Sequence, residues 1–183
     1  MLPCPSWLSR SLEGGFVDWW TATQRTLDRI GLASGDRVLE IGPGPGRLLI
    51  PAAARVRPGG TVVGLDVQAG MIERLKKRGA GVENLSTELG NAENMPFGEA
   101  CFDVVYMAMV LGEIPHREQA LAECFRVLKP GGRLSITEMA ADPHFQSRAT
   151  VTRLAAAAGF VRPDIIGRPW SFTASFAKPT SAS

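Results

Sequence analysis

Three glycines spaced by single residues, Gly42, Gly44 and Gly46, follow Glu40 and an apolar run. Glycines let a backbone approach a ligand closely, and the N-terminus of a following helix offers free N–H groups. The dinucleotide-binding fingerprint requires a further glycine at position 47, where this chain has Arg47. The Gly-Lys-Ser/Thr ending of the phosphate-binding P-loop is absent too. The spacing therefore favours a ligand that is neither a pyrophosphate nor a triphosphate.

A carboxylate, Asp66, closes the next apolar run, about 20 residues beyond the glycines, where it can accept hydrogen bonds from both hydroxyls of a ribose. An aspartate here also suits the N-cap of a helix expected from Ala69, and this alternative stays open. The acidic residue before the first glycine, the glycine spacing and the aspartate together predict a site for a ribose-containing ligand.

Short apolar runs alternate with amphipathic stretches along most of the chain. Continuous apolar strands that alternate with helices indicate a parallel sheet covered on both faces. We expect helices over 16–31, 48–56, 69–78, 117–128 and 148–158, and strands over 38–41, 61–66, 85–89, 102–107 and 134–137.

Turn signals separate these elements. Pro-Gly-Gly occurs at 58–60 and at 130–132, each time between an expected helix and an expected strand. Near the C-terminus, apolar and polar residues alternate over 170–176, which indicates a strand with one buried and one wetter face. With 164–166 before it and a turn at 167–169, this segment predicts an antiparallel hairpin at a sheet edge.

The composition is that of a globular chain. With 183 residues it is long enough for one domain, and 45% hydrophobic and 21% charged residues exclude a wholly disordered chain. A net charge of +2 gives no electrostatic argument for nucleic acid. The three separated cysteines and two histidines argue against a metal site and favour a reducing compartment. No apolar run reaches the ~20 residues of a spanning helix, so we expect a soluble, cytoplasmic protein.

The chain resembles the class I S-adenosylmethionine-dependent methyltransferases, and is most similar to the small enzymes related to the ubiquinone/menaquinone-biosynthesis group. The resemblance covers residues 36–140, and the C-terminal hairpin also fits it. It rests on five segments in order: VLEIGPGPG at 38–46, GLD at 64–66, NAENMPF at 91–97, FDVV at 102–105 and RVLKPGG at 126–132.

The resemblance implies an α/β fold, a three-layer Rossmann-like sandwich. Its seven-stranded sheet would be mostly parallel, with the order 3-2-1-4-5-7-6 and strand 7 antiparallel. We expect an N-terminal helical cap segment over 1–35, the S-adenosylmethionine-binding domain over 36–179, and a tail over 180–183.

The resemblance also implies cofactor contacts. Glu40 and the glycine loop would hold the methionine part of S-adenosylmethionine, and Asp66 the ribose. Asn91 stands where the family usually has aspartate, and its carbonyl oxygen can still accept a hydrogen bond from the adenine amino group. The implied cofactor residues are Glu40, Gly42, Pro43, Gly44, Gly46, Asp66, Val67, Met71, Asn91, Ala92 and Met107.

The residues that face the methyl acceptor are expected after the fourth and fifth strands. Methyl transfer from a sulfonium is an in-line displacement on an activated donor, so a base is needed only if the nucleophile must lose a proton early. Glu113 and His116 are candidate bases. The alternative for His116 is a surface residue that opens the next helix. Relatives often have histidine where Gly112 or Glu113 stands, so the acceptor does not follow from the resemblance.

Aromatic residues of the first helix, Phe16, Trp19 and Trp20, are candidates for the substrate cleft. The alternatives are a helix packed on the sheet and the cofactor pocket, or a weak contact with a membrane surface. The Asn/Asp-Pro-Pro-aromatic signature of amino-methylating nucleic-acid enzymes is missing at 106–109, which favours a small-molecule acceptor and no nucleic acid.

Two other functions remain open at this point. One is a non-catalytic module that binds S-adenosylmethionine or a partner, because methyl transfer needs few dedicated side chains. The other is a nucleotide-dependent oxidoreductase, which Arg47 disfavours. The sequence leaves the acceptor, the methylated atom and the oligomeric state open.

Overall fold

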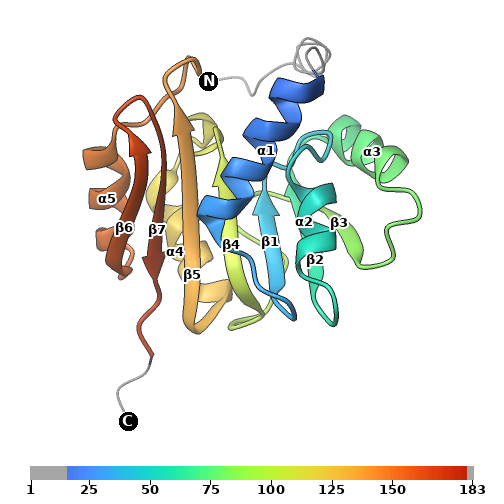
Figure 1. The fold of residues 1–183 in the computed structure, drawn as a ribbon. Helices are drawn as coiled ribbons and strands as arrows, with labels where there is room; N and C mark the ends of the chain where they lie inside the picture. The colour runs from blue at the N-terminus through green and yellow to red at the C-terminus, as the bar shows by residue number, and fades with distance from the viewer. Residues whose placement is uncertain (1–15, 181–183) are drawn as a thin grey trace.

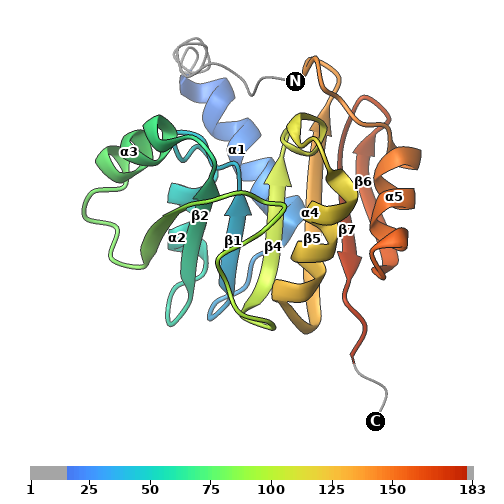
Figure 2. The same cartoon turned by 180° about the vertical axis from the view of Figure 1, so that it is seen from behind.

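The computed structural model describes residues 16–180, with side chains described from residue 22 onward. Within this part, seven strands form one sheet between two layers of helices (Figures 1 and 2). The helices are α1 (Phe16–Ile30), α2 (Leu49–Arg55), α3 (Ala69–Arg78), the short 3₁₀ helix η2 (Leu111–Glu113), α4 (Arg117–Val127) and α5 (Arg148–Ala157). The strands are β1 (Arg37–Ile41), β2 (Thr61–Asp66), β3 (Leu85–Leu89), β4 (Phe102–Ala108), β5 (Leu128–Met139), β6 (Val161–Arg168) and β7 (Ser171–Ala177).

The sheet has the order β3-β2-β1-β4-β5-β7-β6. Strands β3, β2, β1, β4 and β5 pair in parallel, and β7 runs antiparallel to both β5 and β6. The predicted order and the antiparallel seventh strand are therefore confirmed. Because the carboxyl ends of parallel strands meet at one edge of a sheet, the loops that follow β1, β2, β4 and β5 lie at the same edge.

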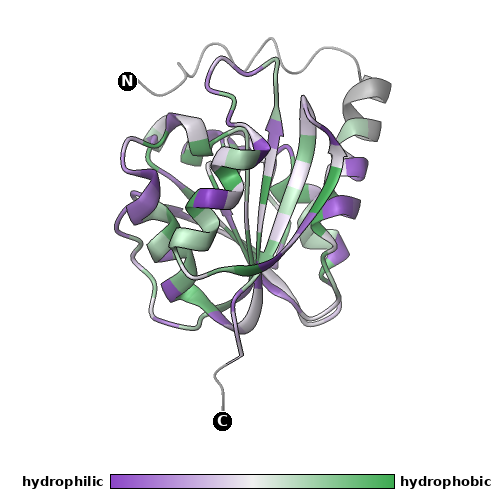
Figure 3. Ribbon diagram, turned by 90° about the vertical axis from the view of Figure 1, so that its left-hand side faces the viewer, coloured by the Kyte–Doolittle hydropathy of each residue, from purple (hydrophilic) through white to green (hydrophobic). Residues whose placement is uncertain are grey.

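Apolar side chains pack on both faces of the sheet. In β4, Val105 and Met107 join the core under α4 and α5, whereas Val104 and Tyr106 join the core under α1 and α2. This alternation follows from the two-residue period of a strand, and burial of both faces explains the continuous apolar run in the sequence. Figure 3 shows the sheet from its side, between helix layers whose outer sides carry hydrophilic residues.

The predicted first helix is confirmed as α1. Thr23, Leu27 and Ile30 are buried against the sheet. The helix ends where the N–H of Gly31 donates to the carbonyl of Leu27 and Gly31 adopts a φ of +69°. The side chains of Phe16, Trp19 and Trp20 lie outside the described residues.

Strand β5 is longer than the sequence predicts. It begins directly after α4, so the Pro-Gly-Gly at 130–132 lies inside β5, and the expectation of a separate turn there is wrong. The reason is pairing with the chain beyond β7: the N–H of Gly131 donates to the carbonyl of Lys178, and the N–H of Lys178 donates to the carbonyl of Gly132. At 58–60 the same three residues do separate α2 from β2, as expected.

The expectation of a wetter face on the last strand is also wrong. Both faces of β7 are buried, because it lies between β5 and β6 and packs against α1 and α5. Its hydroxyl side chains pair with those of β5, with Ser135 Oγ 2.8 Å from Ser175 Oγ and Thr137 Oγ1 2.9 Å from Thr173 Oγ1. The turn of the hairpin falls after Arg168, later than predicted.

Candidate functional site

The three glycines after β1 lie in different surroundings. A Cβ at Gly42 would lie 2.6 Å from a Val110 methyl, and one at Gly46 would lie 2.5 Å from a Leu75 methyl. A Cβ at Gly44 would meet no other atom within 4 Å. All three have positive φ angles, which favour glycine. Gly42 and Gly46 therefore allow close packing of the protein itself, and Gly44 presents its backbone to open space, where a ligand can approach.

Asp66 connects the glycine loop to the start of α3. Its Oδ2 accepts a hydrogen bond from the N–H of Gly44 at 3.3 Å, and its Oδ1 accepts one from the N–H of Gln68 at 2.9 Å. The N-cap position of α3 is Gln68, so the alternative in which Asp66 is the N-cap is wrong. Burial raises the pKa of the Asp66 carboxyl, and the backbone N–H groups oppose this increase.

Exposed apolar side chains lie beside this buried carboxylate. Val67 is 61% exposed, and Leu89, which pairs with Asp66 across the sheet, is 53% exposed. Met71 and Ala92 are buried. Isolated apolar side chains on a protein surface are ordinary. Two of them beside a carboxylate, however, offer an apolar surface on which a flat ring of a ligand can pack. Leu89 was missed from the sequence because its own strand has no clear apolar pattern.

Asn91 uses its side chain within its own loop. Its Oδ1 accepts a hydrogen bond from the N–H of Glu93 at 2.9 Å, and its Nδ2 lies 3.4 Å from Glu93 Oε2. An amide oxygen has two lone pairs, so one remains for a ligand. Met107 pairs with Ile41 at the end of β1, but its side chain is fully buried in the core below the loop.

Glu40 is a buried acid bonded to Tyr106. The Tyr106 hydroxyl donates to Glu40 Oε2 at 2.7 Å, and the two residues are direct neighbours in β1 and β4. Burial raises the pKa of Glu40 to about 8, although Tyr106 and the positive charge of Arg47 lower it. Burial lowers the pKa of Arg47, and Glu40 opposes that change. Arg47, which stands where the dinucleotide-binding fingerprint has glycine, is thus a cation that lowers the pKa of Glu40.

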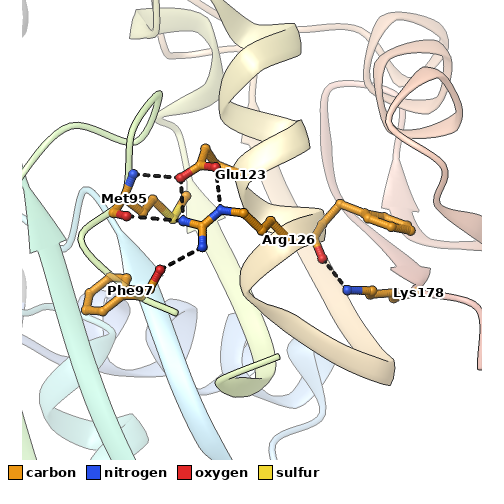
Figure 4. A network of polar contacts seen from close by, with 6 residues as sticks. Met95, Phe97, Glu123, Arg126 and Lys178 are labelled. Carbon is orange, nitrogen blue, oxygen red and sulfur yellow. Dashed lines mark hydrogen bonds and ion pairs between the residues drawn. The ribbon is translucent and has the colours of Figure 1, made fainter. Parts of the chain in front are cut away.

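The 91–97 loop is held from α4 by an ion pair (Figure 4). Glu123 Oε2 accepts from the N–H of Met95 at 2.8 Å, and the Arg126 guanidinium donates to the carbonyls of Met95 and Phe97. Arg126 Nε lies 2.6 Å from Glu123 Oε1 and lowers the pKa of that carboxyl. Helix α4 therefore fixes the loop that carries Asn91 and Ala92.

The turn after β4 carries the two candidate bases. Glu113 ends η2 and is half-buried. His116 is exposed at the N-cap position of α4, where its N–H donates to Glu93 Oε1 at 2.9 Å. This position is the surface alternative considered for His116. Arg117 holds the turn from α4, because its guanidinium donates to the carbonyls of Leu111 and Gly112.

A hollow of about 380 Å³ lies at the opposite, amino-terminal edge of the sheet. The charged groups that line it are already used by the protein: Lys129 Nζ is 2.8 Å from Asp103 Oδ1, and Arg133 donates to the carbonyl of Gly31. Among the described residues no cluster of His, Cys, Asp and Glu could hold a metal ion, and no helix is long and apolar enough to cross a membrane. The carboxyl edge is therefore the better candidate site.

A parallel sheet with an open glycine loop after β1 and a buried carboxylate at the end of β2 defines a class of α/β proteins that bind adenosyl-type cofactors at the carboxyl edge. Residues 39–136 match the family model described as a methyltransferase domain. The chain belongs to this family, whose cofactor is S-adenosylmethionine.

Several relatives are similar over most of this chain. The ubiquinone/menaquinone biosynthesis C-methyltransferase UbiE of Pseudomonas paraeruginosa is 38% identical over 130 residues, which are 69% of this chain and 50% of that protein. The demethylmenaquinone methyltransferase of Symbiobacterium thermophilum is 37% identical over 107 residues, which are 57% of this chain and 43% of that protein. The chain thus spans about half the length of the curated relatives it matches.

The fold is also found in a solved structure of an Aquifex aeolicus SAM dependent methyltransferase. The two share a TM-score of 0.78 and 23% sequence identity, over 85% of this chain and 89% of that one. The residues of the carboxyl edge fit the cofactor chemically: Asp66 offers carboxylate oxygens, Val67 an apolar face and Gly44 an open backbone.

The raised pKa of Glu40 predicts that cofactor binding releases a proton. At pH 7 the free protein holds this carboxyl protonated, because its pKa is about 8. A cationic ligand favours the carboxylate, so binding of S-adenosylmethionine at pH 7 should release close to one proton, and the affinity should rise by up to about tenfold per pH unit toward pH 8. Titration calorimetry in buffers of different ionisation enthalpy measures the proton release.

The Glu40→Gln variant should release no proton, whereas Glu88→Gln, on the exposed part of β3, should behave like the parent. The free protein provides a second check. Because the pKa of Glu40 is raised above its ordinary 4.5, the free energy of unfolding should fall as the pH rises from 4.5 to about 8, and less so in the variant. Proton release from Glu40→Gln equal to that from the parent would contradict the assignment.

Proposed function

We propose that this chain transfers a methyl group from S-adenosylmethionine to a ring carbon of a small hydroxylated aromatic acceptor of the quinol type. The observation that carries the proposal is the carboxyl edge itself, where Asp66 holds the glycine loop beside the open backbone of Gly44 and the exposed Val67. Membership of the methyltransferase domain family supports methyl transfer. The names of the relatives, a C-methyltransferase and a demethylmenaquinone methyltransferase, support the acceptor class.

When bound, S-adenosylmethionine supplies a methyl group already activated by a positively charged sulfur. The methyl group would pass to a ring carbon of the quinol in exchange for the proton of that carbon, with S-adenosylhomocysteine as the leaving group. Glu40 and the glycine loop would hold the methionine part, and Asp66 would hold the ribose. Glu113, on the turn after β4, takes up a proton from the acceptor, which general-base catalysis would accelerate by about 10²–10⁴-fold.

Residues 36–179 form the cofactor-binding domain in this proposal, and the N-terminal segment 1–35, of which residues 1–15 lie outside the described residues, is proposed as a cap. The course of α1 supports the cap: its first turns lie at the same end of the sheet as the carboxyl ends of β1 and β4 (Figure 1). Phe16, Trp19 and Trp20 belong to those turns, and their side chains, which lie outside the described residues, remain our proposed residues of the substrate cleft. We further propose a cytoplasmic location, which the free thiols of Cys101 and Cys124 support.

The acceptor class is tested with 1,4-dihydroxynaphthalene, kept reduced, as a quinol probe. Incubation with S-adenosylmethionine should give S-adenosylhomocysteine and a ring-methylated naphthoquinol in equal amounts, measured by mass spectrometry. The oxidised naphthoquinone is the matched control and should give no product, because its ring carbons are poor nucleophiles. Cofactor binding without product from the quinol would contradict the proposed acceptor, and would favour the non-catalytic alternative or another acceptor class.

The role of Glu113 is tested by Glu113→Gln. With the same quinol, this variant should lower kcat by about 10²-fold or more. It should leave cofactor affinity within about 1 kcal/mol of the parent, because the two sites share few contacts. The control is Glu118→Gln, an exposed carboxylate on α4, which should leave kcat unchanged. Normal turnover by Glu113→Gln would show that Glu113 does not take the proton, and loss of cofactor binding would place it at the cofactor.

A further inference from the structure

Glu138 is a buried carboxyl that the reaction described above does not use. It is the penultimate residue of β5 and is 1% exposed. Its Oε2 accepts a hydrogen bond from the N–H of Gln146 at 3.1 Å, and its Oε1 is buried with no partner among the described residues. A buried carboxyl with one unpaired oxygen is costly to the fold, so its position calls for an explanation.

The hydrogen bond from Gln146 ties down the 140–147 loop, which connects β5 to α5. Other contacts shape this loop: the N–H of Asp142 donates to the carbonyl of Met139, and Gln146 Nε2 donates to the carbonyl of His144 at 2.8 Å. The ring of Phe145 packs edge-on against Phe172 of β7, with 6.2 Å between ring centroids. Glu138 thus binds the loop close to where α5 begins.

The 140–147 loop in turn lies directly on the turn after β4. A Cβ at Gly112 would lie only 1.8 Å from the carbonyl oxygen of His144, so the two backbones are in contact. Gly112 is the residue before Glu113. The same turn is held by Arg117, which donates to the carbonyls of Leu111 and Gly112 at 3.1 and 3.0 Å. The turn is therefore held both by Arg117 and by contact with the loop that Glu138 anchors.

The charges around Glu138 agree with this geometry. Burial raises its pKa to about 7, the hydrogen bond from Gln146 and the positive charge of Arg117 lower it, and the negative charge of Asp142 raises it. Arg117, which holds the turn after β4, and Asp142, in the 140–147 loop, are thus both close enough to Glu138 to act on its charge. The match to the family model ends at residue 136, so Glu138 and the 140–147 loop lie outside the matched region.

We propose that Glu138 is a positioning residue for the methyl acceptor. Through Gln146 it holds the 140–147 loop against Gly112, and this contact fixes the turn that carries Glu113 at the acceptor side of the cofactor. The consequence for catalysis rests on the proposed function, whereas the coupling between the two loops does not.

The coupling is tested on the whole chain with bound S-adenosylhomocysteine, by hydrogen–deuterium exchange. Glu138→Leu removes the oxygen that accepts the hydrogen bond of the Gln146 N–H. Exchange should therefore become about tenfold faster or more in the peptides that cover 140–147 and in those that cover 109–116. Glu138→Gln keeps a carbonyl oxygen at the same place and should restore most of the protection. Affinity for S-adenosylhomocysteine should stay within about twofold in both variants.

Glu123→Leu is the matched control, because it removes a carboxyl that anchors another loop. Glu123 accepts from the N–H of Met95, so this variant should speed exchange in 91–97 and weaken S-adenosylhomocysteine binding, and leave 140–147 protected. Gly112→Ala is a second test that leaves Glu138 intact. Its methyl group must push the turn away from His144, so it should speed exchange in the same two peptides as Glu138→Leu.

Kinetics with 1,4-dihydroxynaphthalene provide the functional readout. Glu138→Leu should lower kcat about tenfold, because the turn that carries Glu113 is no longer fixed, with the KM for S-adenosylmethionine changed less than about twofold, and Glu138→Gln should return kcat toward the parent value. If the parent does not methylate the quinol, the proposed acceptor fails, and exchange still decides the role of Glu138. Unchanged exchange in 109–116 in both Glu138→Leu and Gly112→Ala would overturn the inference, as would a Glu138→Leu variant that loses S-adenosylhomocysteine binding.

Discussion

Asp66 accepts hydrogen bonds from two backbone N–H groups that belong to different loops, those of Gly44 and Gln68. This is possible only because β1 and β2 run in parallel and end at the same edge, so that the loop after one strand meets the last residue of the other. The contacts continue along the edge from there. Gly42 packs against Val110 of the turn after β4, and that turn meets the 140–147 loop held by Glu138. The carboxyl edge is one connected structure from β2 to β5.

The described carboxyls whose pKa values are clearly shifted fall into two groups with opposite behaviour. Glu40, Asp66 and Glu138 are buried at the carboxyl edge, and burial raises the pKa of each. Glu123 and Asp103 lie beside Arg126 and Lys129, which lower their pKa values. The second group is typical of ion pairs that hold a structure together. The first group is costly to keep, and such groups gather where a protein binds or transforms a ligand. This contrast supports the carboxyl edge as the site.

Much of this architecture could be predicted from the sequence. The apolar runs and amphipathic stretches predicted the helices and the parallel strands, because burial on both faces leaves a clear periodic signal. The resemblance added the strand order and the antiparallel seventh strand, which the structure confirms. The length of β5 was missed, because Pro130-Gly131-Gly132 is typical of a turn: Gly131 does have a positive φ of 78°, but the segment also pairs with Lys178 and so belongs to the strand.

Contacts that depend on register or loop shape could not be predicted. The bond between Tyr106 and Glu40 requires the pairing of β1 with β4, which no local pattern specifies. The 140–147 loop has no periodicity, so nothing in the sequence places Gln146 at Glu138 or His144 at Gly112. Both cases concern residues brought together from distant parts of the chain. The second case lies on the side of the site that we propose for the methyl acceptor, where the resemblance to the family was least informative.

Calorimetric titration of S-adenosylhomocysteine into the parent and into Asp66→Ala tests the central claim most directly. The parent should bind S-adenosylhomocysteine and give no heat with NAD. Loss of hydrogen bonds to a charged group, about 1.5–3 kcal/mol, should weaken binding by Asp66→Ala about 10–150-fold. Glu88→Ala, an exposed carboxylate on the neighbouring strand, should bind as the parent does. Equal affinity in the parent and Asp66→Ala, or binding of NAD in place of S-adenosylhomocysteine, would contradict the account.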